Sequence, residues 1–562
     1  MAGSVSTAPL VVGIAPHLIA LPILLPLLAG SLAAAVGGFS RRLSRFVGLV
    51  ASALHLVVCV WLMWLVQDNA VHVYQMGNWS APFGIVIVLD RLSALMLLLT
   101  STLSFIGLMY ANAAWSGQGR RFQALWQYQM MGLCGAFLTG DLFNLFVFFE
   151  VLLAASYALL LHGGGRQRVG ATFHFVVINL TASAVFLIAL ALFYSVTGTL
   201  NMAHMAQVIA TIAPTDVGLV GVCAILLLSV FMIKAGLFPF HFWVPASYGS
   251  AAAPVVALVV AKVGAYAILR VYPLIFGDGL ADVDSAAASL ANLARPWLLT
   301  LSVLTLLVGS MGVLASQTLR QLAATLTLVS IGTLFVPLAV GSTASLSAAV
   351  FYLLHSTVAT ATLFIIAEWV GTHRGRLGDR FVPGPQISHP ILIGGALLWA
   401  LITSVGLPPT SGFIGKVLVL ESLADARGAA IMWVAILVSS FCALIAVSRA
   451  LSLLLWNNTD ADPSLVGMHP SGMKGIDPPQ EYLLTPVQSH DGKALGGLIA
   501  TILVLCVSLF LVAQAGLIKR QTLLMSQQIV DQGAYVNAVM KNSGGLGDLL
   551  RRSPARPEGV SK

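Results

Sequence analysis

Two stretches of the chain decide its fold: IKAGLFPFHFWVP at 233–245 and GLPPTSGFIGK at 406–416. Both place glycine and proline inside an otherwise apolar run, with Lys234 before the break in the first and Lys416 after the break in the second. Proline removes a backbone donor and interrupts a helix. At membrane depth, an interruption is tolerated where the freed backbone groups line a polar cavity. The two stretches therefore predict discontinuous membrane-spanning helices beside a polar path.

The composition of the chain places these breaks in a lipid bilayer. Of its 562 residues, 58% are apolar and 9% are charged, whereas a soluble domain has about 25% charged residues. This excludes an ordinary soluble domain, and the high apolar content excludes a disordered chain. The apolar runs are continuous rather than alternating, which argues against a β-barrel. We expect an all-α polytopic membrane protein.

Continuous apolar runs of about 20 residues predict about fourteen transmembrane helices. Pro239 falls in the seventh run, and Pro408 and Pro409 fall in the twelfth. Two interrupted helices in corresponding positions are typical of transporters built from inverted repeats. The separation of five helices therefore predicts two inverted five-helix repeats, at about 122–275 and 296–456. The expected limits of the runs are 13–37, 45–67, 90–114, 122–140, 142–162, 168–197, 216–245, 252–275, 296–315, 319–341, 345–371, 389–422, 428–456 and 495–518.

These helices divide the chain into three expected regions. Residues 1–89 hold the first two helices and a short hairpin at 72–89. Residues 90–455 hold both expected repeats and both interrupted helices. Residues 456–562 hold a polar, proline-rich cytoplasmic loop, the last helix and a weakly ordered tail from position 519 onward.

Basic residues alternate between the loops and predict the orientation in the membrane. Every second loop carries a cluster of arginines, whereas the loops 69–89 and 198–215 contain no Lys or Arg. The positive-inside rule makes the basic loops cytoplasmic, so the N-terminus and the hairpin face outward. Fourteen helices would place the C-terminus outside as well, although Lys519 and Arg520 in the tail favour the opposite side. Residues 200–212 are expected to form an amphipathic surface helix.

Five ionisable residues stand in the middle of predicted helices, where a charge costs several kcal/mol. They are Glu150, Lys234, Lys262, His355 and Lys416. A single buried Lys–Glu pair can simply lock two helices together, and a lone histidine can form a hydrogen bond within a core. A set of charges of both signs spread over several helices exceeds what one structural pair needs. We therefore interpret these five residues as functional.

The chemistry of such a set is proton transfer. Desolvation favours the neutral form of a lysine, and an adjacent carboxylate favours the charged form. A Glu150–Lys234 pair would therefore hold a proton on the lysine when closed and let it leave when opened. Lys262 and His355 would extend this relay, since histidine titrates near pH 6.5 and suits a switching point.

Other charged residues have a structural interpretation. Glu368, Arg270 and Glu421 lie nearer the ends of predicted helices, where long side chains reach the membrane interface. Asp90 and Asp141 open helices, where a carboxylate interacts favourably with the N-terminus. We assign these five residues no role in transport.

At the five functional residues the sequence resembles the proton-translocating antiporter module. This module occurs in the large antiporter-like subunits of respiratory complex I and of Mrp/Pha-type multisubunit cation/proton antiporters, and the resemblance covers roughly residues 90–455. It implies fourteen helices in two inverted five-helix repeats. The motifs that carry it are FFE with Glu150, IKAGLFPFHFWVP with Lys234 and His241, AKVGAYAILR with Lys262, YLLH with His355 and GLPPTSGFIGK with Lys416.

The resemblance also implies a role for each residue. Glu150 and Lys234 match the glutamate–lysine pair of the first half-channel. Lys262 matches the bridging lysine, and His355 matches the central histidine. Lys416 matches the ionisable residue at the second broken helix. A central hydrophilic axis would join the five residues across the membrane plane.

The sequence departs from the pattern of this module at three positions. Tyr248 stands where many members carry a second histidine, Ala359 where many carry a lysine, and Thr318 where an acidic residue is common. The second half-channel is therefore less charged than in many members. Only one helix is expected after residue 456, which leaves no room for the long lateral helix of the largest complex I subunit. These features fit the D-type subunits of Mrp/Pha antiporters better.

We therefore expect a membrane subunit of a secondary antiporter, rather than an enzyme, that exchanges H⁺ for Na⁺ or K⁺. It would act in the cytoplasmic membrane together with the other subunits of an Mrp/Pha-type complex. A proton-pumping subunit of a complex I-like oxidoreductase or membrane hydrogenase is the alternative, and a non-transporting scaffold subunit is the third possibility. The sequence shows no Walker loop, dinucleotide fingerprint or metal-ligand cluster, so we expect no cofactor, no metal and no nucleic-acid partner.

Overall fold

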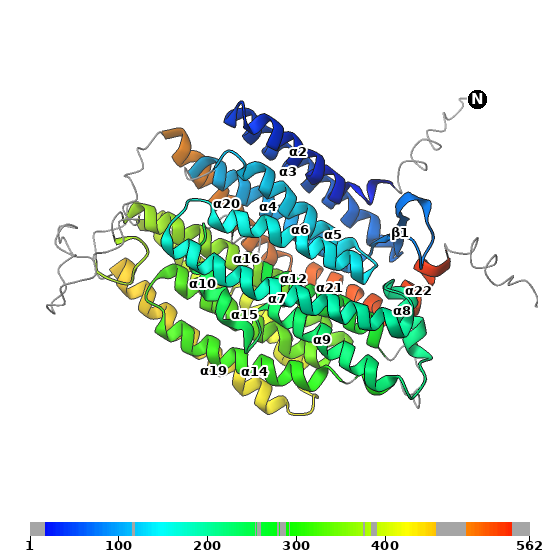
Figure 1. Ribbon diagram of the computed structural model, residues 1–562. Helices are drawn as coiled ribbons and strands as arrows, with labels where there is room; N and C mark the ends of the chain where they lie inside the picture. The colour runs from blue at the N-terminus through cyan, green and yellow to red at the C-terminus, as the bar shows by residue number, and fades with distance from the viewer. Residues whose placement is uncertain are drawn as a thin grey trace, which may run out of the picture.

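The computed structural model describes residues 17–114, 119–252, 255, 260–277, 280, 288–291, 293–374, 377–383, 390–456 and 491–541. Nearly all of these residues form helices that pack roughly side by side (Figure 1). The described elements are α2 (Leu21–Gly37), α3 (Arg41–Leu65), η1 (Val66–Asp68), β1 (His72–Gln75), η2 (Met76–Asn78), β2 (Val86–Leu89), α4 (Arg91–Ala114), α5 (Phe122–Leu138), α6 (Leu142–Leu161), α7 (Arg166–Thr197), α8 (Met202–Ala210), α9 (Val217–Ala235), η3 (Phe240–Phe242), α10 (Trp243–Ser250), α12 (Val260–Phe276), α13 (Ala288–Ala291), α14 (Arg295–Ala315), α15 (Leu319–Val340), α16 (Thr343–His373), α17 (Pro390–Val405), α18 (Ser411–Ser422), α19 (Ala429–Leu451), η5 (Ser452–Trp456), α20 (Asp491–Ala513), α21 (Ala515–Val530) and α22 (Gln532–Lys541).

Ten stretches in the described part of the chain are helical, long and apolar enough to cross a membrane. Two shorter apolar helices, Leu21–Gly37 and Ile391–Val405, accompany them. This confirms a mostly helical, multi-pass membrane protein. The total of fourteen helices and their arrangement in inverted repeats stay predictions.

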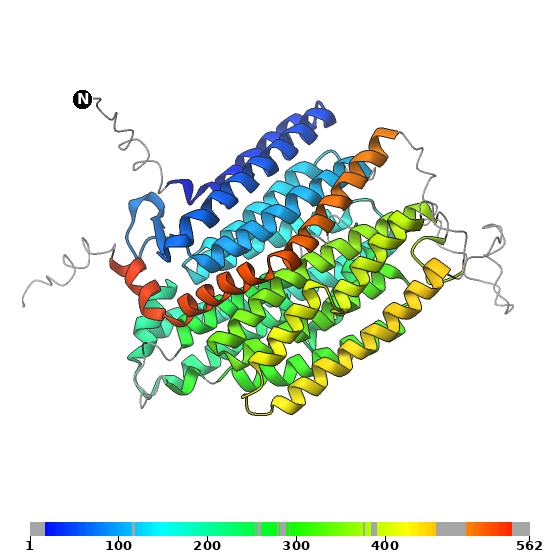
Figure 2. The same ribbon diagram turned by 180° about the vertical axis from the view of Figure 1, so that it is seen from behind.

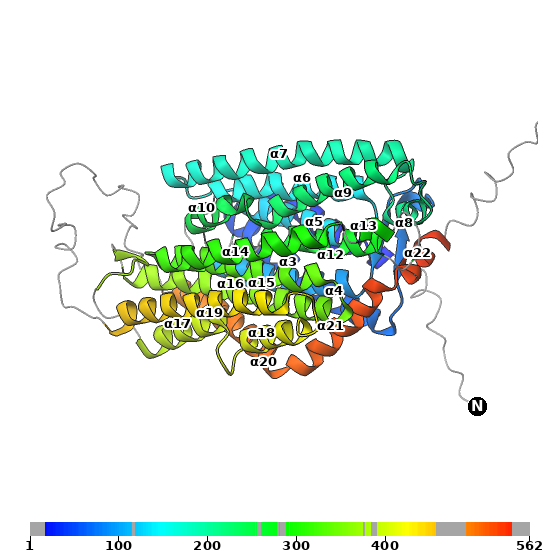
Figure 3. The same cartoon turned by 90° about the horizontal axis from the view of Figure 1, so that it is seen from below.

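The helices are arranged around a buried centre. Seen from below, α6, α7 and α9 lie along one side, α17, α18 and α19 lie along the opposite side, and α12, α14, α15 and α16 lie between them (Figure 3). The most apolar stretch of α16 is entirely buried, whereas only 33% of the corresponding stretch of α19 is buried. Apolar side chains on the outer helices therefore face the bilayer or other proteins, and polar side chains on α12, α15 and α16 are shielded from both.

Both stretches predicted to be broken leave helical geometry. The first gap separates α9 from η3 and α10 and contains Pro239. The second separates α17 from α18 and contains Pro408 and Pro409. The first broken helix continues to Ser250, beyond the expected limit at residue 245, because α10 follows η3 without a further break.

One end of the helical body carries the expected hairpin, and we refer to it as the hairpin end. Strands β1 and β2 pair antiparallel, with His72 opposite Leu89. The expected helix near 200–212 is α8, which starts at Asn201, where the side-chain oxygen accepts hydrogen bonds from two backbone N–H groups of the first turn. α8 buries Met202 and Met205, and it packs against α12 and α22 at the hairpin end.

The expectation of a weakly ordered tail from position 519 is wrong as far as Lys541. After α20, helices α21 and α22 run along the back of the molecule to the hairpin end (Figure 2). An apolar stripe explains this order, because Ile518, Met525 and Ile529 are buried on one face of α21. The expected loop at 457–494 lies outside the described residues as far as position 490, and α20 begins at Asp491, a few residues before the expected start of the last helix. The chain beyond Lys541 also lies outside the described residues.

Arg91 fastens α21 to the body of the molecule. Its Nη1 donates to Oε1 of Gln521 (2.6 Å), and its backbone N–H donates to Oε1 of Gln528 (3.0 Å). The same guanidinium donates to Oδ1 of Asn69 (2.6 Å) and to the carbonyl of Gln67 (3.0 Å). A buried guanidinium needs partners for its donors. This network therefore holds the first turn of α4, the segment around η1 and helix α21 together.

Helices α9 and α12 approach closely at Gly264. A Cβ atom at this position would lie 2.4 Å from the backbone nitrogen of Ala235 and 2.7 Å from the carbonyl carbon of Lys234. Neither contact can be relieved by rotating a side chain, so an added methyl group must push the two helices apart. The missing side chain of Gly264 thus sets the distance between the helices that carry Lys234 and Lys262.

We expect Gly264→Ala to lower the thermal unfolding midpoint of the detergent-solubilised protein. Forcing an extra methyl group into a packed interface costs about 1–3 kcal/mol. Gly170→Ala in α7 is the matched control, because a Cβ there would meet no atom within 4 Å. Equal midpoints for the two variants would contradict the close packing of α9 on α12.

Candidate functional site

The first broken helix ends in a Schellman motif directly after Lys234. α9 stops at Ala235, and Gly236 adopts a φ of +74°, a left-handed conformation that glycine reaches without steric penalty. The backbone N–H of Leu237 donates to the carbonyl oxygen of Met232 (3.1 Å), which satisfies a carbonyl left free at the helix end. Lys234 is therefore held in the last turn of a half-helix, beside the interruption.

The second broken helix repeats this geometry. α17 stops at Val405, Gly406 has a φ of +83°, and the N–H of Leu407 donates to the carbonyl of Ile402 (3.0 Å). In both breaks the glycine is followed by the pattern Leu-X-Pro. The helix resumes at Ser411, and the half-helix α18 carries Lys416 one turn farther on.

Glu150 and Lys234 lie within electrostatic range of one another but form no ion pair among the described residues. Oε1 of Glu150 accepts a hydrogen bond from the hydroxyl of Ser183. Nζ of Lys234 is buried without a hydrogen-bond partner in the described structure and lies 5.0 Å from the ring centroid of Phe149. Lys234 is therefore held by packing, by the aromatic ring and by the field of a nearby carboxylate.

Lys262 contacts the residue that follows His355 in α16. Nζ of Lys262 donates to Oγ of Ser356 (2.8 Å) and makes a longer contact of 3.4 Å with Oγ of Ser330. His355 makes a 2.9 Å hydrogen bond through Nδ1 to Oγ of Ser411. Lys262 and His355 are each only 3% exposed, so the polar contacts of both side chains are made inside the helical body.

Lys416 is bound by the broken helix itself. Its Nζ donates to the carbonyl oxygen of Val405 (2.7 Å), the last residue of α17, and to Oγ of Ser440 (2.7 Å) in α19. The carbonyls at the end of a helix have no intrahelical partner, so the break supplies an acceptor for a buried ammonium group. A Cβ atom on Gly412 would lie 3.0 Å from Cε1 of His355, which shows how closely α18 approaches the histidine.

The structure thus gathers the last three predicted residues in one region, whereas the first two, Glu150 and Lys234, form no direct ion pair in the described structure. The side chains of three predicted residues each contact a serine hydroxyl in the same buried region, beside the start of α18; they are Lys262, His355 and Lys416. Glu150 and Lys234 lie on the far side of the contact between α9 and α12 at Gly264. Every one of these groups can hold or pass a proton, and among the described residues no group of three His, Cys, Asp or Glu side chains could hold a metal ion.

Several hydroxyl groups of this site were not predicted from the sequence. They are Ser183, Ser330, Ser356, Ser411 and Ser440. Serine is common in apolar helices, so its presence alone is no signal. The usable signal is position: Ser356 directly follows the histidine, and Ser411 opens the helix after the second break.

The interface role expected for Arg270 is wrong. Arg270 is 6% exposed and forms a bidentate ion pair with Asp90, at 2.5 Å to Oδ2 and 2.7 Å to Oδ1. The sequence did not suggest this pair, because 180 residues separate its members. Asp90 also has the predicted capping role, because its Oδ1 accepts the backbone N–H of Ser93 (2.9 Å).

Comparisons with known proteins place the chain in a family. The profile of the family described as NADH:quinone oxidoreductase/Mrp antiporter, TM, matches residues 139–444. A protein from Rhizobium meliloti (strain 1021), named as the probable D subunit of a K(+)/H(+) antiporter, is 40% identical over 440 residues, which is 73% of this chain and 79% of that protein. A protein from Bacillus subtilis (strain 168), named as the D subunit of a Na(+)/H(+) antiporter, is 33% identical over 455 residues, which is 80% of this chain and 88% of that protein.

Solved structures of other proteins superpose on most of this chain. A chain of the Mrp complex from Dietzia sp. DQ12-45-1b superposes with a TM-score of 0.79 at 28% identity, over 93% of this chain and 99% of that chain. A chain of respiratory complex I from Thermus thermophilus superposes with a TM-score of 0.67 over 92% of this chain and 99% of that chain; at 23% identity this likeness shows a shared fold. The chain belongs to the family of multi-pass membrane subunits shared by NADH:quinone oxidoreductases and Mrp antiporters.

Proposed function

We propose that this chain is the D-type member of an Mrp/Pha-type multisubunit antiporter that exchanges H⁺ for Na⁺ or K⁺ across the cytoplasmic membrane. Relatives that are 40% and 33% identical are named as D subunits of K⁺/H⁺ and Na⁺/H⁺ antiporters. The chain also superposes over most of its length on a chain of an Mrp complex. The partners are therefore the other subunits of such a complex, the transported ions and the lipid bilayer.

Within this protein, the proton moves along an axis of Glu150, Lys234, Lys262, His355 and Lys416. The observation that carries this proposal is that Lys262, His355 and Lys416 are buried on adjoining helices and each contacts a serine hydroxyl: Lys262 contacts Ser356, His355 contacts Ser411 at the start of the half-helix α18, and Lys416 on the same half-helix contacts Ser440. Serine hydroxyls both donate and accept hydrogen bonds. They can therefore stay bonded to a lysine in either protonation state.

The open arrangement of Glu150 and Lys234 supports a switch at the start of the axis. If the two side chains close on one another, the carboxylate stabilises the ammonium form of the lysine. In the open arrangement Lys234 has no hydrogen-bond partner in the described structure, so burial favours the loss of its proton, which Lys262, with its two serine partners, would receive. Closing and opening this pair would thus load and unload the axis.

The alternative, a proton-pumping subunit of a complex I-like or hydrogenase-linked machine, uses the same residues. It is the weaker candidate because the relatives that share at least 33% identity over most of the chain are named as antiporter subunits. A scaffold role accounts poorly for three lysines and a carboxylate at positions where charge is costly.

We expect Glu150→Gln to reduce cation-dependent collapse of a pH gradient to the level of vesicles that lack the protein. The substitution keeps the hydrogen bond to Ser183 and removes the charge that acts on Lys234. The assay uses vesicles that contain the whole complex, with Na⁺ and K⁺ compared. Glu421→Gln, at an exposed carboxylate of α18, is the control; full exchange by Glu150→Gln in an intact complex would support the scaffold role instead.

We also expect Ser411→Ala to slow exchange while leaving assembly unchanged. Loss of the hydrogen bond to His355 removes about 0.5–1.5 kcal/mol, which corresponds to an initial rate lower by about two- to tenfold. Ser422→Ala in the same helix is the matched control, because its hydroxyl bonds only the carbonyl of Val419 (2.8 Å). Equal rates for the two variants would remove Ser411 from the proton path.

A further inference from the structure

The side chains around Lys262 are polar, whereas those one helical turn nearer the hairpin end are mainly apolar. Lys262 contacts Ser330 and Ser356. One helical turn closer to the hairpin end, α12 carries Tyr266, α15 carries Leu334 and α16 carries Leu353. The exposure of these three side chains is 1% each, so the polar surroundings of Lys262 end abruptly in this direction.

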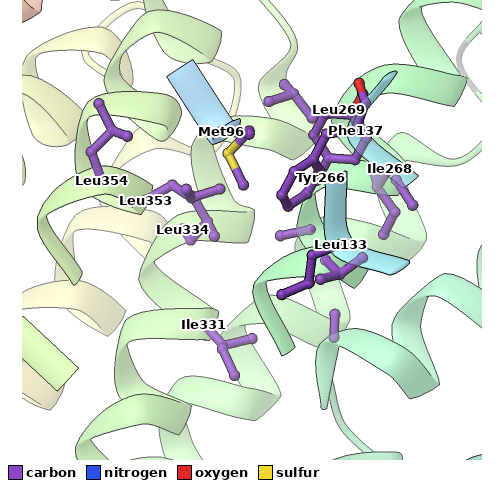
Figure 4. Close-up of a cluster of buried hydrophobic side chains, with 14 of the residues drawn as sticks. Met96, Leu133, Phe137, Tyr266, Ile268, Leu269, Ile331, Leu334, Leu353 and Leu354 are labelled. Atoms are coloured by element: carbon purple, nitrogen blue, oxygen red, sulfur yellow. The ribbon is translucent and has the colours of Figure 1, made fainter. Parts of the chain in front are cut away.

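Tyr266 stands in the middle of this apolar level (Figure 4). Its ring packs edge-on against Phe137, with 4.8 Å between the ring centroids. Its hydroxyl donates to the carbonyl oxygen of Phe137 (2.7 Å) and so points away from the lysine level. We refer to Tyr266 and its neighbours as the apolar layer; the neighbours are Met96, Leu133, Phe137, Leu334 and Leu353, each no more than 2% exposed.

The Asp90–Arg270 ion pair lies directly beyond the apolar layer. Arg270 is one turn past Tyr266 on α12, and its Nε donates to the Tyr266 hydroxyl (3.2 Å). Both oxygens of Asp90 accept hydrogen bonds from the guanidinium, and Nη2 donates further to Oγ of Ser93 (3.1 Å). Every polar side-chain atom of Asp90, Tyr266 and Arg270 therefore has a protein partner.

Helix α22 covers the Asp90–Arg270 ion pair. The ring of Tyr535 in α22 lies 5.6 Å from Cζ of Arg270, within the range of a cation–π interaction. Nε2 of Gln532 donates to the carbonyls of Pro273 (2.7 Å) and Leu274 (3.0 Å) at the end of α12. α22 thus holds the last turns of α12 in place over the ion pair.

The surroundings of Lys234, the residue before Lys262 on the proposed axis, differ from those of Arg270. Near Lys234, buried polar atoms lack protein partners in the described structure: Nζ of Lys234 itself, Oη of Tyr157 and Oδ1 of Asn179. Buried polar groups of this kind are normally satisfied by water. The contrast indicates that water reaches the axis at Lys234, whereas every polar side-chain atom of Asp90, Tyr266 and Arg270 has a protein partner. Beyond the ion pair, Oε1 of Gln532 in α22 is again buried without a partner in the described structure.

We propose that Asp90, Arg270, Tyr266 and the apolar layer form a seal that stops Lys262 from exchanging protons directly with the hairpin side of the membrane. With this exit closed, a proton on Lys262 can leave only along the axis, back toward Lys234 or onward toward His355 and Lys416. This inference rests on the proposed proton axis and assigns Asp90, Arg270 and Tyr266 as positioning residues.

Stability alone accounts poorly for the ion pair. Removing two charges from water costs several kcal/mol per ion, so a buried pair contributes little compared with apolar side chains of the same volume. The pair lies on the turn of α12 between the apolar layer and the hairpin end. From this position it keeps water out of the layer. Loss of one partner leaves a buried charge that draws in water.

The test measures proton leak in vesicles that contain the whole complex and no transported cation. We expect Asp90→Asn to raise this cation-independent leak several-fold, because the unpaired Arg270 admits water to the layer. Tyr266→Phe, which removes a single hydroxyl, should raise the leak less and keep the complex assembled. Tyr272→Phe is the matched control on the same helix, since its hydroxyl donates to the carbonyl of Ala224 on another face.

Combination with Lys262→Ala separates this proposal from the proton axis. If the seal guards Lys262, the leak of Asp90→Asn disappears in the double variant Asp90→Asn/Lys262→Ala. A leak that persists in the double variant, or assembled Asp90→Asn and Tyr266→Phe variants that stay as tight as Tyr272→Phe, would overturn the seal. If Lys262→Ala alone leaves cation-dependent exchange intact, the proton axis fails first, whatever the leak shows.

Discussion

The desolvation of lysine inside the bilayer is the constraint on which the rest of this structure depends. Each buried ammonium group of the axis needs compensation, and each obtains it without an ion pair to a described residue. Lys262 contacts two serine hydroxyls, Lys416 contacts a carbonyl at a helix end and a third serine, and Lys234 lies by an aromatic ring in the field of Glu150. Hydroxyls accept from an ammonium and donate to an amine. Compensation of this kind therefore leaves the protonation state free to change, which an ion pair would not.

The Asp90–Arg270 pair shows the opposite solution at the same depth of burial. Its guanidinium stays charged under any physiological condition, and the carboxylate is engaged through both oxygens. Such a pair has nothing to exchange. The helix α12 thus carries a switchable cation at Lys262 and a fixed one at Arg270, two turns apart, with the apolar layer around Tyr266 between them. We interpret this order along one helix as a division between the part of the axis that moves protons and the part that holds them in.

Much of this arrangement could be predicted from the sequence. The free-energy cost of a charge or a proline within a membrane-spanning helix depends on the residue type and its place in the apolar run, and both can be read from the sequence. Glu150, the lysines and both broken helices were identified in this way. Partners could not be predicted, since Ser356, Ser411 and Ser440 resemble any serine in an apolar helix and Asp90 is far from Arg270 in the chain. The tail was misjudged for a related reason: α21 has an apolar stripe, but the glutamines and basic residues beside it hide the pattern until α16 and Arg91 are in place.

The region around Ala359, which we interpret as the second half-channel, carries few charges for the same physical reason. Where related modules often carry a lysine, Ala359 is buried here at 4% exposure, and the neighbouring polar groups are threonines: Oγ1 of Thr327 and Oγ1 of Thr360 lie 3.5 Å apart. One cation fewer means less repulsion for a proton that leaves Lys262, because like charges in a low-dielectric interior oppose each other strongly. In the proposed axis the step from Lys262 toward His355 therefore starts at Ser356, whose hydroxyl accepts a hydrogen bond from Lys262 (2.8 Å). Ser356, rather than a second lysine, then positions the proton donor of that step.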